Sequence, residues 1–151
     1  MFSSLFLSKN QRLVKRWKKE HEKIVILTHK VIAEYSKNNY KKAKKNLILL
    51  NHLAIDHIID EDINFYKFLN GTQEIPYNKR NSIVDFIDTF KDTKVELMSF
   101  LTKYTRNETI LDEEFFQQFN ELTEIIIERI QYEERNLYAL LDKLTEKENL
   151  N

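Results

Sequence analysis

Residues 50–69 read LNHLAIDHIIDEDINFYKFL, and this stretch largely decides the fold of the chain. Its apolar side chains recur at intervals of three and four residues, which is the period of one face of an α-helix. Two polar residues, His57 and Glu61, occupy positions in this series where the period requires a buried side chain. The stretch therefore predicts a helix that packs against others and carries polar groups within its buried face.

The same periodicity continues on both sides of this stretch and predicts four helices in all. Their expected ranges are 8–36, 40–70, 79–104 and 112 to about 147. Ser8 with Gln11 has the pattern of a capping box, and Asp112 is a suitable N-cap for the last helix. Gly71 is expected to end the second helix, because glycine accepts the left-handed conformation.

Composition supports a helical protein. The chain has 151 residues with 1 Gly and 1 Pro, which is too few for the turns that an antiparallel sheet needs. We therefore predict an all-α fold, an antiparallel up-down-up-down four-helix bundle. It would form a single domain over residues 1–151, with residues 1–8 as a frayed or docked tail.

Charge and cysteine content exclude several classes of function. The 24 basic residues balance the 24 acidic ones, so we expect no nucleic-acid partner. The absence of Cys excludes disulfide scaffolds, thiolate zinc sites and iron–sulfur clusters. Apolar runs such as 24–27 and 47–50 are far shorter than the ~20 residues of a membrane span. We expect a cytoplasmic protein, with the lysines at positions 41, 42, 44 and 45 on a solvated face.

The polar residues on the buried helix faces are the candidate functional residues. Besides His57 and Glu61, the period places His21 in the first helix and Glu133 in the last on buried faces. At 1.5 Å per residue in antiparallel helices, the four residues come to similar levels in the middle of the bundle. Buried charges are costly unless they are paired or bind a metal. Two imidazoles and two carboxylates suit iron, manganese or zinc.

An alternative without a metal accounts for the same residues equally well. Lys94 and Arg129 lie on or beside the buried faces and could neutralise the two glutamates as ion-pair partners. His29 and His52 fall off the buried faces and are expected on the surface. Tyr132 could donate a hydrogen bond to a ligand, as could Tyr138, but a packing role is the usual one for such a tyrosine.

Three parts of the chain together resemble the hemerythrin-like family, also called His-His-Glu cation-binding domains. They are the pair Glu20-His21, the stretch 50–69, and residues 129–141, which read RIQYEERNLYALL. The resemblance implies a four-helix bundle that holds non-haem iron and binds oxygen, or senses oxygen, nitric oxide or iron. It also implies which residues bind the metal: His21, His57, Glu61 and Glu133.

The chain departs from that family where a second iron would bind. Arg129 stands where the family usually has a His, and residues 79–104 contain no His. We therefore expect the site to bind at most one metal ion or to be a metal-free remnant. If it binds a metal, iron is the expected one, and another divalent metal is the alternative. The expected role is sensing or regulation without catalytic turnover.

A second resemblance implies a function of another class. The pair Arg16-Trp17 and residues 115–142 resemble regulator-of-sigma-D proteins, which are also four-helix bundles and hold no metal centre. This resemblance implies a metal-free regulatory protein that binds a protein partner such as a sigma factor. It does not account for His57 and Glu61, so it ranks second.

Overall fold

The computed structural model describes residues 8–71 and 75–149, with side chains described through residue 143. The helices are α2 (Lys9–Ser36), α3 (Tyr40–Leu69), α4 (Tyr77–Tyr104), α5 (Glu113–Tyr132) and α6 (Tyr138–Asn149). A π-helical segment, η1 (Glu133–Leu137), joins α5 to α6. These described residues contain no strand. Of the tail predicted over residues 1–8, residues 1–7 lie outside the described residues.

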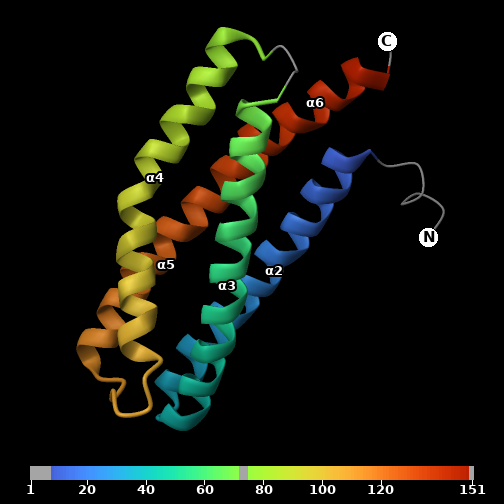
Figure 1. Cartoon of the computed structure of the whole chain (residues 1–151). Helices are drawn as coiled ribbons and strands as arrows, with labels where there is room; N and C mark the ends of the chain where they lie inside the picture. Colours follow the sequence, from blue (N-terminus) through green and yellow to red (C-terminus); the bar gives the residue numbers. More distant parts are fainter. Residues whose placement is uncertain (1–7, 72–74, 150–151) are drawn as a thin grey trace, which may run out of the picture.

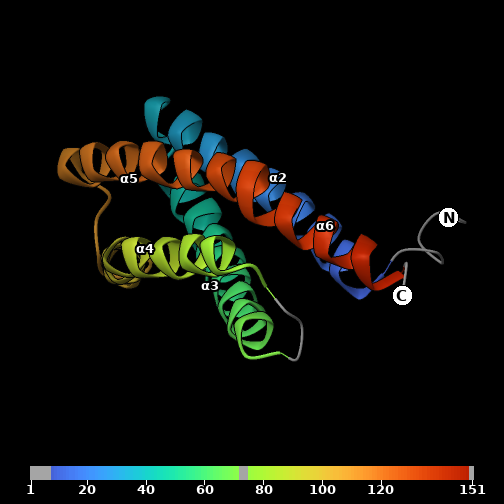
Figure 2. The same cartoon turned by 90° about the horizontal axis from the view of Figure 1, so that it is seen from above.

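The helices form four long rods, because α5, η1 and α6 continue one another (Figure 1). Consecutive rods run in opposite directions (Figure 1). α2 packs along α3, α4 contacts α3, and α6 lies beside α2 (Figure 2). The prediction of an all-α four-helix arrangement is confirmed.

The helix starts follow the capping residues in the sequence. The backbone N–H of Gln11 donates to the Ser8 hydroxyl, and the side chain of Gln11 accepts from the Ser8 N–H, both at 3.1 Å. Asp112 accepts from the backbone N–H of Phe115 at 2.9 Å. Both predicted caps are confirmed. α4 starts two residues earlier than expected, because the carbonyl of Pro76 already accepts helical hydrogen bonds.

The helix ends correct one prediction. α3 does end close to Gly71, but Gly71 does not have a positive φ. A left-handed glycine is therefore not what ends this helix. Asn38 adopts that conformation instead, with φ 64°, between α2 and α3. Its N–H donates to the carbonyl of Tyr35, and the N–H of Asn39 donates to that of Glu34. These are the two hydrogen bonds of a Schellman motif, with asparagine in the usual position of glycine.

The buried side chains form two clusters along the bundle. One lies toward the α2–α3 turn and includes Ile24, Val31, Leu47, Phe100 and Phe115. The other lies toward the chain termini and includes Val14, Trp17, Phe65, Ile83 and Tyr138. The polar residues predicted on the buried faces of α2 and α3, namely His21, His57 and Glu61, lie between the two clusters.

Lys44 differs from the solvated lysine that the sequence predicts. Its Nζ donates to the carbonyls of Tyr104, Arg106 and Thr109 at 2.6–2.7 Å. One of these carbonyls belongs to the last residue of α4 and the other two to the loop after it. The Lys44 ammonium therefore donates hydrogen bonds to backbone carbonyls at a helix end, where helical partners are missing. Burial lowers the pKa of Lys44. The charge on α3 therefore holds the α4–α5 connection in place.

We expect Lys44→Met to lower the free energy of unfolding by about 1–3 kcal/mol, because hydrogen bonds from a charged donor to three carbonyls would be lost. Urea unfolding followed by circular dichroism measures the change. Lys45→Met, at an exposed position on the same helix, is the matched control. Equal stabilities of the two variants would contradict a structural role for Lys44.

Candidate metal centre

Four polar side chains meet where the two core clusters adjoin. α2 supplies His21, α3 supplies His57 and Glu61 one turn apart, and Glu133 is the first residue of η1. Their exposed fractions lie between 3% and 6%. One possible ligand atom from each residue lies within 4.8 Å of all the others. The structure thus brings together all four residues that the sequence singles out, and the group could hold a metal ion.

The atoms that face one another are imidazole nitrogens and carboxylate oxygens. Nε2 of His57 lies 2.9 Å from Nε2 of His21 and is paired with Oε1 of Glu61. Nε2 of His21 lies 3.2 Å from Oε1 of Glu133 and 3.7 Å from Oε1 of Glu61. Both imidazoles thus direct the same nitrogen to the centre of the site.

The other nitrogen of each imidazole is held by a further carboxylate. Nδ1 of His57 is 2.7 Å from Oε1 of Glu20, and Nδ1 of His21 is 3.2 Å from Oε1 of Glu134. An ionised carboxylate only accepts hydrogen bonds, so we assign the proton to Nδ1 in each ring, which leaves a lone pair on Nε2 of the neutral imidazole. A carboxylate behind the histidine is typical of metal-binding histidines.

This arrangement leaves the centre with more acceptors than donors. Two protonated Nε2 atoms cannot lie 2.9 Å apart as partners, so at most one proton fits between His21 and His57. Among the described side chains, the Tyr138 hydroxyl is the neutral donor that the structure places against these atoms. Buried acceptors that lack a donor are costly. A cation at the centre would satisfy them together.

Without a metal, protons take that place. Burial by itself would lower the pKa of His21, but hydrogen bonds to Glu133 and Glu61 raise it to about 10. Burial also opposes a charged His57, yet the pairing with Glu61 raises its pKa. Burial, and then the charge of Glu61, raises the pKa of Glu133. Burial would raise the pKa of Glu61 too, but hydrogen bonds from the two histidines outweigh it and lower that pKa.

The two cations proposed for the metal-free alternative have other partners. Nζ of Lys94 lies 2.6 Å from both carboxylate oxygens of Asp62. The guanidinium carbon of Arg129 lies 5.3 Å from the ring centre of Phe86 and 5.4 Å from that of Phe90. Among the described residues, no ion pair joins Lys94 or Arg129 to the two buried glutamates. The expected neutralisation by these side chains is therefore not what the structure shows.

The remaining candidates separate into surface and site residues. His29 and His52 are exposed, as expected. Tyr132 is 42% exposed and stacks on Phe86, whereas Tyr138 is fully buried and contacts the site. The helical period did not place Tyr138 there. One feature of the sequence does indicate it. Apolar residues occur in adjacent pairs at 137–138 and 140–141, and this shifts the apolar face of the helix by one residue.

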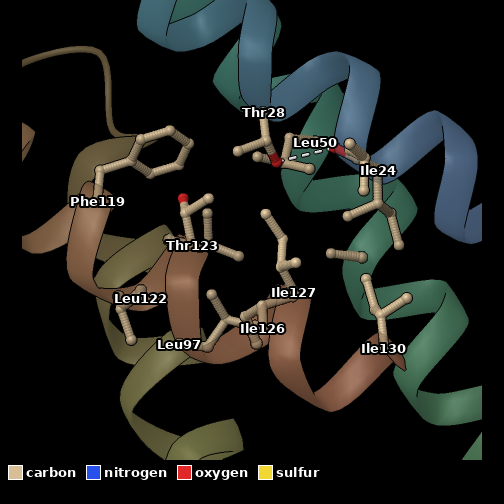
Figure 3. Close-up of a pocket in the computed structure, with 13 residues that line it drawn as sticks. Ile24, Thr28, Leu50, Leu97, Phe119, Leu122, Thr123, Ile126, Ile127 and Ile130 are labelled. Atoms are coloured by element: carbon tan, nitrogen blue, oxygen red, sulfur yellow. Dashed lines mark hydrogen bonds between the residues drawn. The ribbon is translucent and has the colours of Figure 1, made fainter. Parts of the chain in front are cut away.

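An apolar cavity of about 40 Å³ lies next to the site, between α2, α3, α4 and α5 (Figure 3). The Thr28 hydroxyl at its edge donates to the carbonyl of Ile24 at 2.8 Å, so it brings no unpaired polar group to the cavity. Side chains of Ile24, Leu97, Ile126 and Ile130 line both this cavity and the space beside the four polar residues. The surroundings of the site are therefore apolar, which strengthens electrostatic interactions inside it.

Comparisons of the chain with family models, curated proteins and solved structures found no match. Within the described part of the chain, none of the helices combines the length and apolar character needed to cross a bilayer.

We expect the metal-free protein to lose stability as the pH rises from about 6.5 to 10. The folded protein holds a proton on His21 more tightly than the unfolded chain does, so this stabilisation is complete below the ordinary pKa and lost as the pH passes the raised one. The raised pKa of Glu133 acts in the same direction. Urea unfolding in the presence of a chelator, at several pH values, measures the slope.

His21→Gln should flatten this pH dependence, whereas His29→Gln, at an exposed position on the same helix, should leave it unchanged. An equally steep slope in His21→Gln would show that the buried cluster does not hold the protons in question.

Proposed function

We propose that this protein binds a single non-haem metal ion, iron, through His21, His57, Glu61 and Glu133, and that occupancy of the site has a sensing or regulatory role. The observation that carries the proposal is the convergence of four buried ligand atoms within 4.8 Å. The carboxylates behind both imidazoles support it, because they orient each Nε2 toward the centre. Two imidazoles with carboxylates are typical of non-haem iron. The hemerythrin-like pattern of these residues favours the same metal.

One ion rather than two fits the surroundings of the site. The space beside the four polar residues is about 40 Å³ and is bounded largely by apolar side chains. α4 carries no histidine, and Arg129 packs its guanidinium on aromatic rings of α4. These neighbours offer no nitrogen ligands for a second ion.

Occupancy would affect three of the four rods, because the ligands come from α2, α3 and η1. A bound cation would supply the charge that the buried carboxylates need and would hold these three segments together. Its loss would leave the carboxylates to share protons and would weaken the packing of the rods, which is a basis for regulation. The adjoining apolar cavity has room for a small apolar molecule beside the ligands. The proposal assigns no catalytic turnover to the site.

Elemental analysis after anaerobic loading with Fe(II) and dialysis tests this function. We expect about one iron per chain after dialysis. We also expect a higher melting temperature in the presence of free Fe(II), since a free ligand at 100 times its Kd stabilises the fold by about 2.7 kcal/mol. His57→Ala should lose the iron and the thermal shift. His52→Ala, at an exposed position on the same helix, should retain both.

No retained iron in the wild-type protein would contradict the proposal. The same experiment with Mn(II) and Zn(II) separates a wrong metal from the absence of any metal site. If none of the three metals is retained, the remaining interpretation is a metal-free regulatory bundle that binds a protein partner such as a sigma factor. Its partner affinity would then be unaffected by iron or a chelator.

A further inference from the structure

The hydroxyl of Tyr138 lies inside the cluster of polar residues. It is 3.1 Å from Oε2 of Glu61, 3.2 Å from Oε1 of Glu133 and 3.3 Å from Nε2 of His21. Its side chain is fully buried. The phenol oxygen therefore contacts three of the four residues that form the candidate metal centre.

The π-helical segment brings this oxygen to the site. Glu133 and Tyr138 are five residues apart, and in an α-helix their side chains would point about 140° away from each other. In η1 the backbone N–H of Tyr138 donates to the carbonyl of Glu133, which is the i to i+5 bond of a π-turn. The wider turn places residues 133 and 138 on the same face. Such π-turns within α-helices are frequent at functional sites.

Neighbouring aromatic rings hold the phenol in this position. Its ring stacks on His21, with centres 5.6 Å apart and an angle of 12°, and lies 5.5 Å from the ring of Trp17. Trp17 is itself fixed, because its Nε1 donates to Asp60 at 2.8 Å. The position of the oxygen is thus determined by packing as well as by hydrogen bonds.

A neutral phenol can serve only part of this environment. Its single O–H can donate to only one of the three atoms around it. When the imidazole is neutral and the carboxylates are ionised, the other two contacts are lone pairs that face the lone pairs of the phenol oxygen. We propose that Tyr138 is a fifth ligand, binding the metal through its phenolate oxygen. The inference rests on the proposed metal-binding function. As the metal–oxygen bond forms, the phenol O–H breaks and its proton leaves to solvent, as in other metal sites whose ligands must be deprotonated.

The absorption spectrum of the ferric protein tests this inference. The apoprotein is loaded with Fe(II) without oxygen and then oxidised with ferricyanide. A phenolate bound to ferric iron gives a visible charge-transfer band, and we expect this band in the wild-type protein. In Tyr138→Phe it should be lost while the iron content stays within a factor of two of wild type. Tyr132→Phe, which alters an exposed ring six residues earlier, should keep the band.

Iron content and spectrum separate the two proposals. Iron bound without the band in wild type, or a band that persists in Tyr138→Phe, overturns the phenolate ligand and leaves metal binding intact. No bound iron overturns both. If Tyr138→Phe fails to fold, resonance Raman spectra of the wild-type protein decide the question. Phenolate vibrations that shift when the protein is made with ring-deuterated tyrosine support the ligand, and their absence overturns it.

Discussion

The Nε2 atoms of His21 and His57 lie 2.9 Å apart inside the bundle, with the carboxylates of Glu61 and Glu133 directed at the same point. All of these atoms are acceptors in the neutral imidazole and ionised carboxylate forms, and they are shielded from water. Positive charge has to be present among them, either as extra protons or as a cation. The stability of the bundle and its chemistry are therefore coupled at this one place.

The surrounding structure is arranged to keep those acceptors converged. Glu20 and Glu134 each hold the outer nitrogen of one imidazole, which fixes the direction of the inner nitrogen. The two core clusters on either side exclude water and limit the movement of the helices. Because the contributing segments are α2, α3 and η1, a change at the centre reaches three of the four rods. α4 instead supplies aromatic rings that engage Arg129.

The π-helical segment solves a geometric conflict in the last rod. A regular α-helix could place either Glu133 or Tyr138 toward the centre, but not both. The wider turn admits both side chains to one face, and the apolar residues on either side still pack in the core. Such a turn gives up regular α-helical hydrogen bonds, so the contacts of Tyr138 with the site and with Trp17 have to compensate for it.

The sequence alone determined the four rods and the inward orientation of His21, His57, Glu61 and Glu133. A regular helix repeats every 3.6 residues, so the residues on its buried face can be identified from that period. It could not determine the position of Tyr138, which depends on a local break in the same period. The partners of Lys44 and the carboxylates behind the imidazoles were also beyond it. The paired groups belong to different segments of the chain, up to 113 residues apart, and only the packing of the rods and of the loops between them decides which polar atoms come within hydrogen-bonding distance.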